Sequence, residues 1–180
     1  MKKSPVLSVA CAALALCGVA AESRKVAVFA QNDSGEKALD GLVETAREQL
    51  AAVFADAEGF KVVQAKLESD DFKNPTNAAR KAGCDFVAVT TFEKADFAQN
   101  ESGGTVNNVF SLTLSLAVRN AKGAAVDGIP SWTGRYSFTG AGLSPAESYL
   151  QVLEEWKGEV EILVATKAPD WPSSAASDGL

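Results

Sequence analysis

The chain has 180 residues, of which 47% are hydrophobic and 22% charged, with 17 basic and 23 acidic side chains and no histidine. This composition is typical of a globular protein with a hydrophobic core. The missing histidine excludes Ser-His-Asp and Cys-His catalytic systems and histidine metal sites, and the net charge of −6 argues against nucleic acid as a partner.

The N-terminus has the pattern of a secretory signal. Lys2 and Lys3 are followed by an apolar run over residues 6–16 and by small residues that end at Ala21. We expect residues 1–21 to be a signal peptide that is cleaved after Ala21, with Ala20 as the alternative. The run is short for a membrane span and no later stretch is long enough, so we expect no transmembrane segment in the mature chain.

Cys17 offers a second interpretation of the same segment. Bacterial lipoprotein signals carry a small residue just before the cysteine that becomes acylated, whereas Leu16 is large. Cys17 is therefore a candidate lipidation site with an imperfect signal. After cleavage at Ala21, Cys84 would be the only cysteine, so no internal disulfide could form.

The first half of the mature chain predicts alternating strands and helices. We expect a strand over residues 26–30, a helix opened by a capping box of Asp33 and Glu36, a strand over 60–64, a loop over 65–73, a short helix over 74–83 and a strand over 85–92.

The second half contains the clearest strand signal. Between residues 110 and 119, apolar and polar side chains alternate, which predicts an antiparallel strand with one buried face. A turn over 120–123 leads to a partner strand over 132–138, where we expect Trp132 and Tyr136 to join the core. A capping box at Ser144 predicts a long helix that extends to residue 164.

These elements predict an α/β sandwich with one mixed sheet of about five strands and helices packed on it. We expect a single domain over residues 22–167. The composition of residues 168–180 is rich in Pro, Ser, Ala, Asp and Gly, which predicts a disordered tail.

No pattern in the chain indicates catalysis strongly. Ser34 and Lys37 fit the S-x-x-K spacing of a lysine-activated serine, but its partner motifs are missing, so a helix-capping turn is the favoured interpretation. The acidic residues at 68, 70 and 71 lack the spacing of a calcium loop, and Cys84 reads as a buried small side chain. We assign no catalytic, cofactor-binding or metal-binding residue.

The polar stretch over residues 99–108 is longer than a tight hairpin needs. Long loops often carry partner contacts. Asn100, Glu101, Ser102 and Thr105 are therefore candidate residues of a partner-binding loop.

Two further stretches carry a family resemblance. The run from Ala79 to Val89 resembles a small-Gly-small-Asp segment that leads into an apolar strand, and the strand Leu112 to Arg119 ends in an Asn-Ala-Lys-Gly turn. They resemble the CsgG-like group: the periplasmic part of the curli secretion channel, the penicillin-binding-protein activator lipoprotein, and the N-terminal domain of the Tol-system propeller protein. Leu16 and the missing turn threonine depart from that pattern, and the channel's membrane hairpins have no counterpart.

The resemblance implies a periplasmic domain that binds other envelope proteins without catalysis. We therefore expect an exported protein of the periplasm or the outer-membrane surface, with envelope proteins as partners and homo-oligomers as an additional form. The alternative is a periplasmic protein that binds a small ligand or lipid in a cavity between sheet and helices. An enzyme that uses Ser34 and Lys37 is the third hypothesis.

Overall fold

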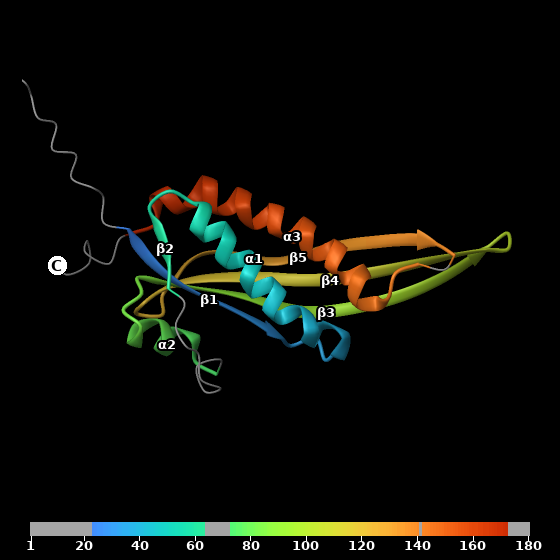
Figure 1. The fold of residues 1–180 in the computed structure, drawn as a ribbon, viewed down its shortest axis with the longest axis horizontal. Coiled ribbons are helices and arrows are strands. Elements are labelled where there is room, and N and C mark those ends of the chain that lie inside the picture. The colour runs from blue at the N-terminus through green and yellow to red at the C-terminus, as the bar shows by residue number, and fades with distance from the viewer. Residues whose placement is uncertain (1–22, 64–72, 141, 173–180) are drawn as a thin grey trace, which may run out of the picture.

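Five strands form one mixed β-sheet with helices packed on it, which confirms the predicted fold class (Figure 1). The computed structural model describes residues 23–63, 73–140 and 142–172. Ala21, Cys17 and the acidic residues at 68–71 lie outside them. The elements are β1 (Arg24–Asn32), η1 (Lys37–Leu42), α1 (Val43–Asp56), β2 (Phe60–Val62), α2 (Pro75–Lys81), β3 (Phe86–Ser102), β4 (Thr105–Asn120), β5 (Ala125–Thr139), α3 (Pro145–Lys167) and η2 (Ala168–Asp170).

The strand order is β2-β1-β3-β4-β5. β1 pairs in parallel with β2 and β3, while β3, β4 and β5 form an antiparallel meander. The parallel pairs follow from the helical connections, and the antiparallel pairs follow from the short turns. The predicted strands over 85–92 and 132–138 are parts of longer strands.

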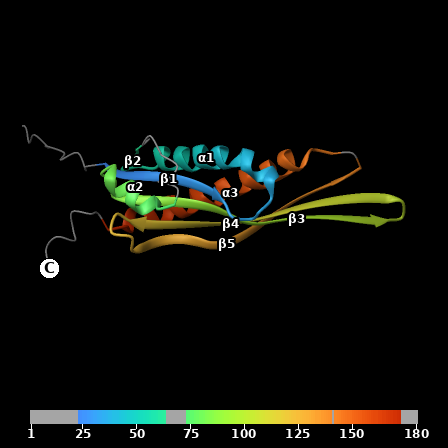
Figure 2. The same cartoon turned by 90° about the horizontal axis from the view of Figure 1, so that it is seen from below.

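The two faces of the sheet bury different clusters. α1 and α3 cover one face, on which the alternating residues from Phe110 to Val118 point into the main core. α2 covers part of the other face, where Phe29 and Val87 pack with Ala79 and Cys84 (Figure 2). The period-2 pattern of β4 therefore separates a helix-covered face from a face with polar side chains.

The ends of the helices are defined by local hydrogen bonds. Ser144 and Glu147 form the predicted capping box at the start of α3. The first helical segment begins differently from the prediction, because Glu36, and not Asp33, caps it, and its first turns are the 3-10 helix η1. The side chain of Glu36 accepts a hydrogen bond from the backbone N–H of Ala38.

The folded chain continues past Lys167, so the predicted start of the disordered tail at residue 168 is wrong. Ala168–Asp170 form η2, and Trp171 is 6% exposed in an aromatic cluster with Phe54, Phe60 and Phe86. The tail composition predicted disorder, but an apolar side chain of this size contributes enough burial to hold the segment.

β3 and β4 form a hairpin that extends past the helices (Figures 1 and 2). The register of the pair shifts between Phe92 and Lys94, which leaves Glu93 as the extra residue of a β-bulge. One extra residue reverses the alternation of side chains. Phe92 and Phe97 therefore both lie on the helix-side face, although the four residues between them, an even number, would place them on opposite faces of a regular strand.

Candidate functional site

The four residues predicted as a partner loop lie on strands. Asn100, Glu101 and Ser102 end β3, Thr105 begins β4, and Ser102 pairs directly with Thr105. Only Gly103 and Gly104 form the turn, with φ of 59° and 76°, values at which a two-residue hairpin turn favours glycine. The expected long loop is therefore wrong, because the strands extend to the tip. A contact role for these exposed residues stays a prediction.

The Ser34 and Lys37 pair is not brought together as a nucleophile and base would be. The Ser34 hydroxyl donates to Asn32 Oδ1 at 2.6 Å and accepts from the backbone N–H of Glu36 at 3.1 Å. Lys37 is exposed at the start of η1. These bonds organise the turn before η1, as the capping interpretation predicts.

Cys84 is buried in the apolar cluster under α2, as predicted. Burial raises the pKa of its thiol, the negative charge of Asp85 raises it further, and Lys25 acts in the opposite direction. A thiol held in its protonated form is a weak nucleophile.

Among the described residues, the helix side of the sheet has a hollow at each end, and we name each by its place. The first, the hairpin groove, has a volume of about 470 Å³ and lies where the β3–β4 hairpin leaves the body. It is lined by Glu36, Ala38, Phe97, Asn108, Phe110, Phe138, Gly140, Gly142, Leu143, Pro145 and Tyr149.

Aromatic rings line the hairpin groove. Phe110 lies centrally, with ring centroids 4.7 Å from Phe97, 6.0 Å from Phe138 and 5.4 Å from Tyr149. Phe110 and Tyr149 are buried, whereas Phe97 is 55% exposed. The bulge at Glu93 places Phe97 opposite Phe110 on this face.

Polar groups hold one wall of the hairpin groove in place. The buried Asn108 amide donates to the Gly140 carbonyl at 3.2 Å and accepts from Gln99 Nε2 at 3.0 Å. Burial raises the pKa of the Tyr149 hydroxyl, and the negative charges of Glu36 and Asp96 raise it further. The hairpin groove therefore has an aromatic floor with acidic groups near it.

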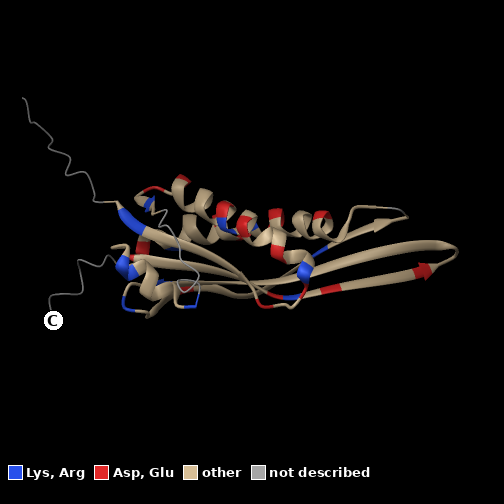
Figure 3. Cartoon of the chain, turned by 60° about the horizontal axis from the view of Figure 1, so that its bottom comes forward, with Lys and Arg blue, Asp and Glu red and all other residues tan. Residues whose placement is uncertain are grey.

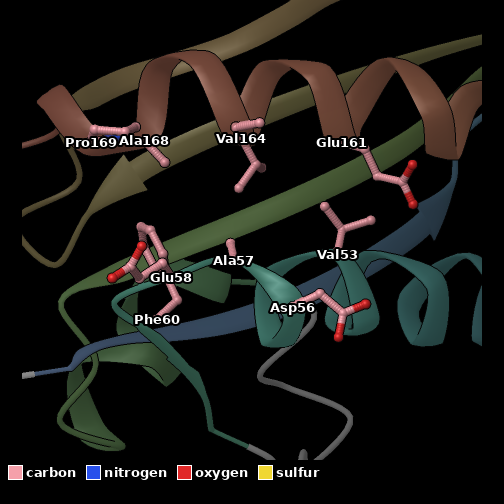
Figure 4. Close-up of a pocket in the computed structure, with 10 residues that line it drawn as sticks. Val53, Asp56, Ala57, Glu58, Phe60, Glu161, Val164, Ala168 and Pro169 are labelled. Atoms are coloured by element: carbon pink, nitrogen blue, oxygen red, sulfur yellow. The ribbon is translucent and has the colours of Figure 1, made fainter.

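The second hollow, the helix cleft, has a volume of about 510 Å³ and lies between the C-terminal ends of α1 and α3 (Figure 4). Its apolar lining includes Val53, Ala57, Phe60 and Val164, and carboxylates of Asp56, Glu58 and Glu161 lie around it. Glu161 pairs with Lys157 at 3.4 Å.

Arg24 supports the helix cleft from the side of β1. Its guanidinium lies 4.2 Å from the ring centroid of Phe60 and donates to the Ala168 carbonyl at 2.7 Å. Arg24 therefore links β1 to Phe60 and to η2 beside the helix cleft.

Across the described ranges, no group of three or more Cys, Asp or Glu side chains has the arrangement of a metal site. Within these same ranges, no helix is both long enough and apolar enough to cross a membrane.

None of the predicted contact residues lines the hairpin groove, and its exposed apolar residues Phe97 and Leu143 were not predicted. Both are isolated apolar residues in polar or small-residue surroundings, so neither belongs to a periodic stripe. The sequence offers one signal for Phe97, which is an aromatic residue inside a polar stretch. Such a residue indicates a binding site only when the register of the hairpin is known.

No protein-family model and no curated protein matches the chain. Solved structures do align with it. A neuraminyllactose-binding hemagglutinin homologue from Helicobacter pylori aligns with a TM-score of 0.50 and 12% identity over 83% of this chain and 86% of that one. At this identity the likeness concerns the fold alone.

Two further structures align with lower TM-scores. A protein described as a lipoprotein from Caulobacter crescentus has a TM-score of 0.46 and 13% identity, over 82% of this chain and 93% of that one. A dodecameric PelC variant from Paraburkholderia phytofirmans has a TM-score of 0.45 and 15% identity, over 82% and 89%.

Proposed function

We propose that this protein is an exported component of the bacterial cell envelope that binds another protein through the hairpin groove, without catalysis. One observation carries the proposal. Among the described residues, three large apolar side chains are exposed, and two of them, Phe97 and Leu143, line this one groove. Exposed apolar side chains that gather beside buried aromatic rings mark interaction sites on soluble proteins.

Other features support the cellular setting. The leader over residues 1–21 has the pattern of an export signal. The resemblance of residues 79–89 and 112–123 to the CsgG-like group agrees with a periplasmic binding domain, and a lipoprotein of that compartment would be acylated at Cys17. The Ser34 hydroxyl serves the turn before η1, which removes the main argument for the enzyme hypothesis.

Photocrosslinking in the native envelope tests the proposal. We expect a protein partner to crosslink when Phe97 is replaced by benzoylphenylalanine. Ile162 is the matched control, because it is the third exposed large apolar residue and lies on α3 outside the hairpin groove. We expect no specific crosslink from position 162, and loss of the crosslink at 97 when Leu143→Ser is added. Equal capture from both positions, or none from 97, would contradict the proposal.

The helix cleft supports a second candidate function. Its apolar lining and volume of about 510 Å³ suit a small amphiphile or lipid chain. A solvent-sensitive probe such as phenylnaphthylamine is expected to gain fluorescence on binding there. Ala57→Trp, which fills the helix cleft, should abolish the gain, while Ala52→Trp on the exposed side of α1 should preserve it. An unchanged signal in Ala57→Trp would reject this candidate.

A further inference from the structure

Part of β3 is an open edge of the sheet. β1 leaves β3 after the pair Asn32 and Phe92, and the backbone N–H of Asp33 donates the last bond to the Phe92 carbonyl at 2.9 Å. From Lys94 to Ser102, β3 pairs with β4 on one side and with no other strand of the described residues (Figure 2). Unpaired edges of this kind are sites for strand addition.

The hairpin turn fixes which backbone groups face outward. In a two-residue hairpin the closing pair, here Ser102 and Thr105, is hydrogen-bonded, so the backbone of Ser102 faces β4. By alternation, the N–H and C=O groups of Phe97, Gln99 and Glu101 point away from β4. The side chains of Phe97 and Gln99 lie on the groove face, because their partners are Phe110 and Asn108.

Acidic side chains outnumber basic ones along this edge. Between residues 95 and 118 the chain has Asp96 and Glu101 and no lysine or arginine (Figure 3). Lys94, just before this stretch, pairs with Asp96 at 2.6 Å. Glu36 adds a carboxylate to the lining of the hairpin groove. Asp96, whose side chain lies on the face of β3 opposite Phe97, would favour basic side chains on that face of an added segment.

The middle of the open edge has no side chain that would protect it from strand pairing. Sheet edges are normally protected by charges, proline or coverage. Glu93 and Lys94 lie at the base of the open edge and Glu101 lies near the tip, but residues 97–100 have no charged side chain. An unprotected stretch beside an apolar groove is the arrangement that strand-adding domains use.

We infer that the partner is held by strand addition: an extended protein segment with alternating apolar and basic side chains pairs with β3 at residues 95–101 and places its apolar side chains in the hairpin groove. The inference rests on the proposed function and specifies the kind of partner. Backbone bonds to the edge supply affinity, and the aromatic groove selects large apolar side chains at every second position.

Amide hydrogen exchange with a defined probe tests this mode of binding. The probe is the acetylated heptapeptide Lys-Phe-Thr-Phe-Lys-Phe-Thr, and its control carries N-methyl groups on alternate backbone nitrogens. We expect the amides of Phe97, Gln99 and Glu101 to gain protection with the probe, while those of Ala98 and Asn100, already paired with β4, change little. The N-methylated peptide should give no protection. Absence of protection with the unmodified probe overturns the inference.

A pair of substitutions separates backbone pairing from side-chain binding. Gln99→Pro removes an outward N–H without breaking the bonds to β4, and proline is tolerated at such edge positions. Gln99→Ala loses the same side-chain bond to Asn108 but keeps the N–H, so we expect Gln99→Pro to bind the probe at least about tenfold more weakly than Gln99→Ala. Equal binding by both variants, in protein that keeps its strand signal, overturns strand addition.

The outcomes also separate this inference from the proposed function. If position 97 still crosslinks a partner in the envelope while Gln99→Pro binds the probe normally, the hairpin groove is a binding site and strand addition is wrong. If the same amides gain protection in the protein alone as its concentration rises, the occupant is a second copy, and the assignment to a partner segment is overturned.

Discussion

Gly134 shows how closely α3 and β5 pack. A Cβ at this position would lie 2.4 Å from Trp132 Cη2 and 2.5 Å from Val152 Cγ1. Both distances are far inside van der Waals contact, so the neighbours would have to move. Gly134→Ala is expected to lower the free energy of unfolding by about 1–3 kcal/mol, measured by urea denaturation.

Gly158 provides the matched control on α3, since an added Cβ would meet nothing within 4 Å. Gly158→Ala is expected to raise stability by about 0.5–1 kcal/mol, because alanine has the higher helix propensity. Comparable losses at both positions would show that the packing at Gly134 is not the cause.

Cys84 should make stability depend on pH in the alkaline range. Its pKa is raised in the folded state above the ordinary value of 9.0, mainly by burial. The contribution of the protonated Cys84 thiol to the free energy of unfolding is therefore complete below the unfolded pKa. It is lost as the pH rises through the folded pKa. Cys84→Ser should remove this part of the decrease between neutral and alkaline pH, measured by denaturant unfolding.

Reaction with a disulfide reagent gives an independent check on Cys84. In the native protein the thiol should react far more slowly than in urea, because it is buried and protonated. Native and unfolded proteins that react at the same rate would contradict this environment.

At the scale of elements, the start of α3 depends on its capping box. The Ser144 hydroxyl accepts from the N–H of Glu147, and the Glu147 carboxylate accepts from the N–H and hydroxyl of Ser144. These bonds lower the pKa of Glu147. Ser144→Ala is expected to cost about 1 kcal/mol of stability through loss of the N-cap.

The same substitution should move the Glu147 titration toward its ordinary value, followed by NMR. Because the pKa of Glu147 is lower in the folded state, its contribution to the free energy of unfolding is present above the unfolded pKa. That contribution is lost as the pH falls through the folded pKa. An unchanged Glu147 titration in Ser144→Ala would show that the capping bonds do not cause the shift.

The elements also show what the sequence could predict. Residues 110–118 alternate strictly, so their strand and buried face were predictable, as was the capping box at Ser144. The bulge at Glu93 was not, because one extra residue interrupts the alternation and makes the strand seem to end at Phe92. Both faces of the hairpin tip are exposed, so its strands have no apolar period and resemble a loop.

The candidate site was missed for the same reason. The sequence placed contacts at Asn100, Glu101, Ser102 and Thr105, close to the hairpin groove along the chain, but it did not include Phe97 or Leu143. The groove depends on a register shift within β3 and on the approach of Leu143 from the segment before α3. Neither is encoded in a local pattern.

At the scale of the whole molecule, the two hollows lie at opposite ends of the helix layer. The hairpin groove lies beside the N-terminus of α3, and the helix cleft lies beside its C-terminus (Figures 1 and 4). Variants in one hollow should therefore leave binding in the other unchanged, because distant sites usually behave additively.

Trp171 holds together the end opposite the hairpin. Its ring contacts Phe54 of α1, Phe60 of β2 and Phe86 of β3, and its Nε1 donates to Asp127 Oδ2 on β5 at 3.2 Å. Four elements therefore meet at one side chain. Because its removal would leave a cavity among them, Trp171→Ala is expected to lower the free energy of unfolding by about 3–5 kcal/mol.

Trp171→Phe separates the ring from its hydrogen bond. Phenylalanine keeps most of the aromatic contacts but cannot donate to Asp127, so we expect a loss of about 1–2 kcal/mol. Both variants can be measured by urea denaturation followed by circular dichroism. A loss below about 1 kcal/mol for Trp171→Ala would show that residues 168–171 contribute little to the fold. The domain would then end near Lys167, as the composition of the tail had predicted.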